Sequence, residues 1–169
     1  MSAGRSILAD TSVVYMMLCL SLAAAVPLLM LCALASRQAA GVVGSAHLAS
    51  ELLEEIRLRR WDEDAPKRRA SIDRPSRALG VDAGENPGDK RSFDDIDDFD
   101  GWAEAKALGP GMEELSGLES FRRSARIAYV DEFHPDSPAQ SPTDLKRVIS
   151  CAQRKGQAAV CLSTLLANR

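Results

Sequence analysis

An uncharged segment near the N-terminus constrains this chain more than any other feature. No acidic or basic side chain lies between Thr11 and Ser36, where the sequence reads TSVVYMMLCLSLAAAVPLLMLCALAS. A helix needs about 20 consecutive apolar residues to cross the hydrocarbon core of a bilayer. Pro27 does not exclude such a helix, because neighbouring groups satisfy the carbonyl that a proline frees. The segment therefore predicts one transmembrane helix, with the lipid bilayer as a partner.

A cleaved secretory signal is the alternative interpretation of this segment. The sequence ALA at residues 33–35 fits a small-residue cleavage site, and cleavage there would leave a chain that begins at Ser36. A signal core usually has 7–15 apolar residues after a basic end. Here the run is longer, and the single preceding cation, Arg5, is offset by Asp10. The transmembrane interpretation is therefore preferred, although the flanking charges do not determine its topology.

A second helical pattern follows the apolar segment. Leu48, Leu52, Ile56 and Arg60 recur every four residues, which is the stripe of an amphipathic helix. No proline interrupts residues 28–65. We therefore expect one long helix from about residue 8 to residue 62, with its first half in lipid and its second half against a soluble domain.

The rest of the chain predicts an α+β fold with about three antiparallel strands. Residues 121–130 alternate in polarity as a strand does, with Phe121, Arg123 and Ile127 on one face. Residues 148–153 and 158–166 are expected to form a hairpin around the turn RKGQ. The expected organisation is a transmembrane and amphipathic helix over 1–62, an exposed or disordered loop over 63–92, and a small β-sheet domain over 93–169.

The stretch RSFDDIDDFDGW, residues 91–102, concentrates acidic side chains. It is not an EF-hand, because aligning Gly101 with the invariant glycine puts Ile96 at the first ligand position and Ala107 at the last. The preferred interpretation is structural: Ile96, Phe99 and Trp102 anchor the segment, and its aspartates face solvent or a basic partner. An irregular calcium site remains the alternative, with these ligands: Asp95, Asp97, Asp98 and Asp100.

Cys151 and Cys161 face each other across the expected hairpin if its turn centres on Gly156. Directly opposed antiparallel residues approach to about 4.5–5.5 Å between Cα atoms, which lies within disulfide range. Two free thiols are the alternative, since a slip of one residue in register separates them.

Three stretches, AHLASELLEEIRLRRWDED, RSFDDIDDFDGW and LKRVISCAQRKGQAAVCLSTLLANR, resemble type IV pilin-like proteins, and among them the minor pilins and pilus modification proteins of MSHA-type systems. The resemblance covers residues 4–62 and 91–166 in the same order. It implies a helical spine with a small β-sheet head, a single pass through the bacterial inner membrane and an extracytoplasmic head. It also implies assembly with other pilin-like subunits, through the N-terminal helix, into a type IV pilus or a type II secretion pseudopilus.

The family's leader pattern is only partly matched by GRSILAD. Cleavage by a prepilin peptidase would fall after Gly4, but Arg5 replaces the family's aromatic residue and Ala9 stands where a glutamate is expected. Asp10 lies one position late for that glutamate. The resemblance therefore leaves two alternatives, a subunit processed after Gly4 and an uncleaved, permanently anchored relative.

The expected function is non-enzymatic. No phosphate-binding glycine loop and no Ser-His-Asp set is found, so no catalytic or cofactor-binding residue is predicted. His47 and His134 have no partners at zinc-ligand spacing. The net charge of −3 gives no reason to expect nucleic acid, and no small-molecule substrate is indicated. The alternative function is a membrane-anchored, extracytoplasmic module that binds a ligand or calcium.

Overall fold

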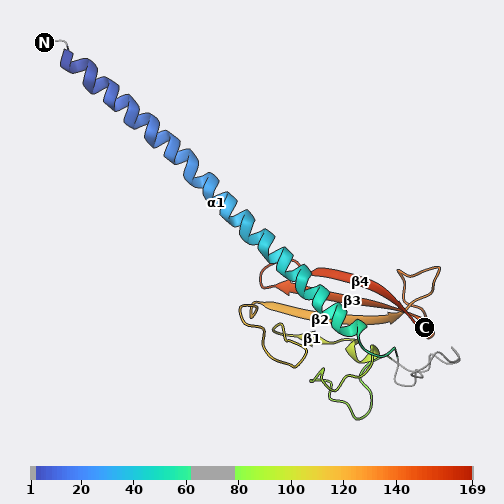
Figure 1. Ribbon diagram of the computed structural model, residues 1–169. Coiled ribbons are helices and arrows are strands. Elements are labelled where there is room, and N and C mark those ends of the chain that lie inside the picture. The colour runs from blue at the N-terminus through green and yellow to red at the C-terminus, as the bar shows by residue number, and fades with distance from the viewer. Residues whose placement is uncertain (1–2, 62–78, 169) are drawn as a thin grey trace. The chain divides into compact units, whose positions relative to one another are not determined.

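The computed structural model describes residues 3–61 and 79–168, with side chains from residue 13 onward. The elements are the helix α1, Ala3–Arg57, the short 3-10 helix η1, Asp97–Phe99, and four strands (Figure 1): β1, Ala103–Glu104; β2, Phe121–Tyr129; β3, Leu145–Arg154; and β4, Val160–Ala167. The chain divides into two compact units, Met1–Ala40 and Gly41–Arg169, called the N-terminal and C-terminal units below.

The N-terminal unit is the first part of α1. Every side chain from residue 13 to residue 40 is exposed, and the helix continues through Pro27. The hydroxyls of Ser21 and Ser36 donate to the backbone carbonyls of Leu18 and Cys32, both at 2.8 Å, so these polar groups are satisfied within the helix. With a mean hydropathy of 2.5 in its most apolar window, α1 is long and apolar enough to cross a membrane, a property that signal sequences share.

The C-terminal unit is an antiparallel meander with the order β1-β2-β3-β4. The end of α1 packs on one face of this sheet (Figure 1), where Leu52 and Ile56 meet Ile127 in the main core. The α+β class is therefore as predicted. The expected central strand and hairpin are present, whereas β1 was missed because its two residues show no period.

Glycine allows the helix to approach the sheet closely at Gly44. A Cβ at this position would lie 3.0 Å from the ring of Phe121, the first residue of β2. A second group of apolar side chains continues from this contact, with Leu48 and Ala49 of the helix against Ala152 of β3.

The helix ends earlier than the sequence predicted. It stops at Arg57 rather than at residue 62, because the next residues pair with the acidic segment instead. The Ile96 N–H donates to the carbonyl of Arg60 at 2.9 Å, and Arg60 forms a parallel bridge with Asp95. A tertiary contact has therefore replaced the last helical turn.

The expectation of an exposed loop over residues 63–92 does not hold at its end. Residues 62–78 lie outside the described part of the chain. Residues 79–92 form turns, and Lys90 is fully buried. Leu79 and Val81 pack against the main core. This charged, glycine-rich stretch looked solvated in the sequence because the ion-pair partners of Lys90 lie elsewhere in the chain.

Candidate functional site

The apolar residues of the acidic segment anchor it in the core, as the sequence predicted. Phe93, Ile96, Phe99 and Trp102 are all at least nine-tenths buried. Phe93 meets Phe99 and Trp102 edge-on, with ring centroids 5.1 and 5.2 Å apart. Such edge-to-face contacts stabilise aromatic pairs beyond the area that they bury.

The aspartates were expected to face solvent or a basic partner, and exposure to solvent is wrong for three of them. Asp95, Asp97 and Asp98 are 3%, 4% and 2% exposed. The carboxylate of Asp95 accepts the N–H groups of Asp97 and Asp98 at 2.8 and 3.3 Å. In return, Asp98 accepts the N–H groups of Asp94 and Asp95 at 3.0 and 3.1 Å. This reciprocal exchange resembles a helix capping box and fixes the turn that contains η1.

The other aspartates join the segment to elements far away in the sequence. Asp94 pairs with Arg60 after α1, and Asp100 accepts the N–H of Ile127 in β2 at 2.9 Å. Asp97 pairs with Lys146 of β3, a fully buried lysine. The acidic segment, residues 91–102, therefore connects the end of the helix to the sheet; it is called the clasp below.

Lys146 has a second set of partners around its ammonium group. It donates to the carbonyl of Trp61 at 2.6 Å and lies 4.5 and 5.2 Å from the ring centroids of Trp61 and Tyr129. A buried cation needs such compensation, because removal of an unpaired charge from water is costly.

The four expected calcium ligands do not converge on one point. The carboxylates of Asp97 and Asp100 are directed to Lys146 and to the Ile127 N–H, as described above. Among the described residues, a different set gathers: Glu85, Asp94 and Asp98 bring carboxylate oxygens within 4.8 Å of one another.

Crowded carboxylates shift the pKa values of this region upward. Burial, together with a hydrogen bond to Asp98 and the charge of that residue, raises the pKa of Glu85 to about 7. Burial and the charges of Asp98 and Asp97 raise the pKa of Asp95 to about 6. Protonation of Glu85 therefore relieves the repulsion between this residue and its acidic neighbours.

A buried charge network surrounds Glu104 of β1. Its carboxylate accepts two hydrogen bonds from the guanidinium of Arg123, at 2.7 and 3.0 Å. It also accepts the indole N–H of Trp102 at 3.1 Å and the backbone N–H of Leu108 at 3.0 Å. Burial raises the pKa of Glu104, but the hydrogen bonds and charge of Arg123, with Leu108 and Lys90, outweigh it and hold the pKa below its usual value.

Lys90 connects this network to the helix. Its ammonium donates to Glu104 at 3.1 Å, to Glu55 of α1 at 2.9 Å and to the Leu108 carbonyl at 3.1 Å. All three N–H donors of the Lys90 ammonium group are therefore used. Two acids and two bases, Glu55, Glu104, Lys90 and Arg123, give the network no net formal charge.

Only one signal in the sequence pointed to this network. The alternation of residues 121–130 put Arg123 on the face that is buried, and a buried arginine requires an acidic partner. Nothing in the local sequence around Glu104 indicated that it is this acidic partner, and nothing around Lys90 indicated that it joins the same network.

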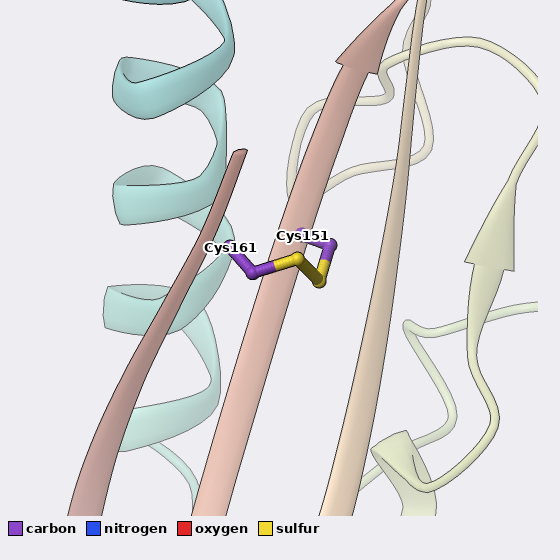
Figure 2. Close-up of a disulfide and its surroundings, with 2 residues drawn as sticks. All are labelled: Cys151 and Cys161. Carbon is purple, nitrogen blue, oxygen red and sulfur yellow. A yellow bond between two sulfur atoms is a disulfide. The ribbon is translucent and has the colours of Figure 1, made fainter. Parts of the chain in front are cut away.

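The disulfide candidates are brought together. Cys151 of β3 and Cys161 of β4 are directly paired, and their sulfurs lie 2.08 Å apart, as a disulfide requires (Figure 2). The bond lies on the sheet face away from α1, since Ser150 and Ala152 are the buried neighbours of Cys151. The expected cleavage point after Gly4 falls in α1, where the structure describes the backbone alone.

Comparison of the chain with protein-family models, with curated proteins and with solved structures gives no match.

Proposed function

We propose that this protein is a non-enzymatic, membrane-anchored, pilin-like subunit for assembly of a type IV pilus or a type II secretion pseudopilus. One observation carries the proposal. A single helix, Ala3–Arg57, is exposed and apolar in its first part and packs on an antiparallel sheet in its last part. Such a helix serves both as an anchor in lipid and as a packing surface for the helices of other subunits.

The C-terminal unit suits an extracytoplasmic location in the bacterial inner membrane. The Cys151–Cys161 bond supports this placement, because disulfides persist in an oxidising periplasm. The clasp and the charge network bind this unit together through partners within the chain, which suits a structural subunit rather than an enzyme.

Amino-terminal sequencing of the mature, membrane-extracted protein tests the proposal. We expect a start at Arg5, which indicates processing after Gly4, together with co-purification of the protein with sheared filaments. A start at Ser36 contradicts the anchored helix. An intact N-terminus with no filament association leaves an anchor but contradicts the assembly role.

Calcium binding is the alternative, and the convergence of Glu85, Asp94 and Asp98 is the observation that favours it. Asp98 already accepts two backbone N–H groups and Asp94 already pairs with Arg60. We therefore expect the melting temperature of the full chain to be the same in calcium and in a chelator. A rise in calcium that Glu85→Gln abolishes would support the alternative instead.

A further inference from the structure

Strand β4 is an open edge of the sheet. Among the described residues its one neighbouring strand is β3, and Figure 1 shows it at the border of the sheet. Its sequence, VCLSTLLA, contains no charged residue and no proline. Natural edge strands usually carry a lysine, a proline or a bulge, because these features discourage pairing with a further strand. The opposite edge, β1, is only two residues long.

The phase of the ladder identifies which backbone groups of β4 are open. The Cα atoms of Cys151 and Cys161 are 4.0 Å apart, the close spacing of a non-hydrogen-bonded pair. The N–H of Val130 donates to the carbonyl of Leu145 at 2.9 Å, so the odd-numbered residues of β3 point their backbone N–H and C=O groups to β2. The even-numbered residues of β3 therefore bond to β4. Because even-numbered residues of the two strands are paired, the even-numbered residues of β4 bond to β3. The following residues point their N–H and C=O groups to the free edge: Cys161, Ser163, Leu165 and Ala167.

No partner covers these groups within residues 3–61 and 79–168. None of the backbone hydrogen bonds outside the regular ladders involves them, and all four residues are exposed. On the other face, Val160, Leu162 and Leu166 remain only half-buried. An added strand with apolar side chains on that face would complete their burial.

The side chains beside the edge indicate the charge of the occupant. The outer face, on the side of the sheet away from α1, carries Arg122 and Arg126 of β2 and Arg147 of β3. The three strands β2, β3 and β4 themselves contain no acidic residue. Arg147 is paired with Leu165 of the edge strand. Its Nη1 atom donates to the Pro135 carbonyl at 3.0 Å, and its Nε atom is buried without a hydrogen-bond partner in the described part of the chain. The guanidinium has no acidic partner there, so a carboxylate beside Leu165 is the group that complements its charge.

We propose that β4 is a docking edge to which another protein adds an extended strand. The added strand presents apolar side chains to the α1 face and at least one carboxylate to the outer face, beside Leu165. A second copy that pairs through its own β4 does not fit, because that strand is uncharged and its outer face carries the same arginines. This interaction goes beyond the proposed assembly function and does not depend on membrane anchoring.

A strand supplied in cis tests the edge in the full chain in detergent micelles. Arg169→Gly creates an Asn-Gly hairpin turn after β4, and the appended strand Thr-Val-Asp-Val-Thr-Val-Thr then places its aspartate opposite Leu165. We expect a higher melting temperature and slower amide exchange at Ser163 and Leu165. Tryptophan fluorescence reports this unit alone, because Trp61 and Trp102 are the two tryptophans of the chain.

Matched variants separate pairing from folding. Ser163→Pro removes an outward N–H, so the unextended protein should keep its melting temperature while the extension loses its effect. Thr164→Pro removes a bond to β3 and should lower the melting temperature without any extension. A lysine in place of the added aspartate should reduce the rise in melting temperature that the extension produces.

Three outcomes would overturn the proposal. One is slow exchange at Ser163 and Leu165 in the unextended chain, as slow as at Thr164, because the edge is then already covered. Another is a dimer in light scattering that Ser163→Pro dissociates, because a second copy is then the occupant. The third is an equal gain from the lysine and aspartate strands, which removes the argument from Arg147.

Discussion

Glu104 shows how a buried charge becomes a structural requirement. Its side chain is completely buried, as is that of Lys90, and both Arg123 and Lys90 depend on it. We expect Glu104→Gln to lower the free energy of unfolding by about 3–5 kcal/mol, because it leaves two buried cations with one acid. Urea unfolding in micelles, followed by tryptophan fluorescence, measures this loss.

An exposed ion pair provides the control for Glu104. The Lys106 Nζ atom lies 2.7 Å from Oε1 of Glu114, but both side chains are at least half exposed. Glu114→Gln should lower the free energy of unfolding much less than Glu104→Gln does, since solvent screens exposed pairs. Equal losses from the two substitutions would contradict the network's role.

Asp95 makes stability depend on pH in the direction opposite to most carboxylates. Its pKa is raised to about 6, and that of Glu85 to about 7, so the folded protein binds more protons than the unfolded chain between about pH 4 and pH 7. Stability from these groups is therefore present at low pH and lost as the pH rises through the folded pKa values. We expect a higher melting temperature at about pH 5.5 than at about pH 8.

Asp95→Asn should flatten this pH dependence and raise the melting temperature at alkaline pH. The asparagine oxygen still accepts the N–H groups of Asp97 and Asp98, but the repulsion from neighbouring carboxylates is removed. An unchanged pH profile in this variant would show that Asp95 does not titrate as described. Below about pH 4.5 the sign reverses, because the lowered pKa of Glu104 makes its contribution disappear on acidification.

At the scale of elements, the disulfide stabilises the hairpin of β3 and β4. Cys151 and Cys161 are separated by 10 residues, and a closed loop of this length contributes about 2–3 kcal/mol. Cys151→Ser with Cys161→Ser should lower the free energy of unfolding by that amount. Cys19→Ala with Cys32→Ala, at the two exposed free cysteines, is the control. A disulfide variant that unfolds like this control would mean that the bond does not form.

The elements differ in how far the sequence predicted them. The alternation in residues 121–130 and the turn at Gly156 were sufficient for β2, β3 and β4, because local polarity sets the face of a strand. The helix end, β1 and the burial of Lys90 were not predictable in this way. Each depends on a partner distant in sequence, such as Asp95 for Arg60, Ser124 for Ala103 and Glu55 for Lys90.

For the acidic segment, the apolar anchor was predictable but the positions of the aspartates were not. The spacing of Ile96, Phe99 and Trp102 predicted the anchor. The burial of the aspartates depends on backbone N–H groups and on Lys146, neither of which has a signature in the local sequence. A run of acids therefore looked solvated when much of it caps turns and pairs with buried cations.

At the scale of the whole molecule, the apolar part of α1 should determine where the protein resides. An arginine at the centre of a membrane span costs about 2.5–3.5 kcal/mol for insertion. Leu18→Arg with Leu22→Arg should therefore move the protein from the carbonate-resistant membrane fraction to the soluble fraction. Leu58→Arg is the control, because Leu58 is 86% exposed in the C-terminal unit. Wild-type protein in the soluble fraction would favour the cleaved signal over the anchor.

The charge network also has a consequence for the order of folding. Its members are separated by 35, 14 and 19 residues along the chain, so it is complete only when the helix, the loop and the meander come together. Dehydration of only some members is unfavourable, so we expect the network to form after the barrier to folding is crossed. Its loss should then accelerate unfolding and leave the folding rate almost unchanged, which makes these four charges determinants of how long the native state lasts.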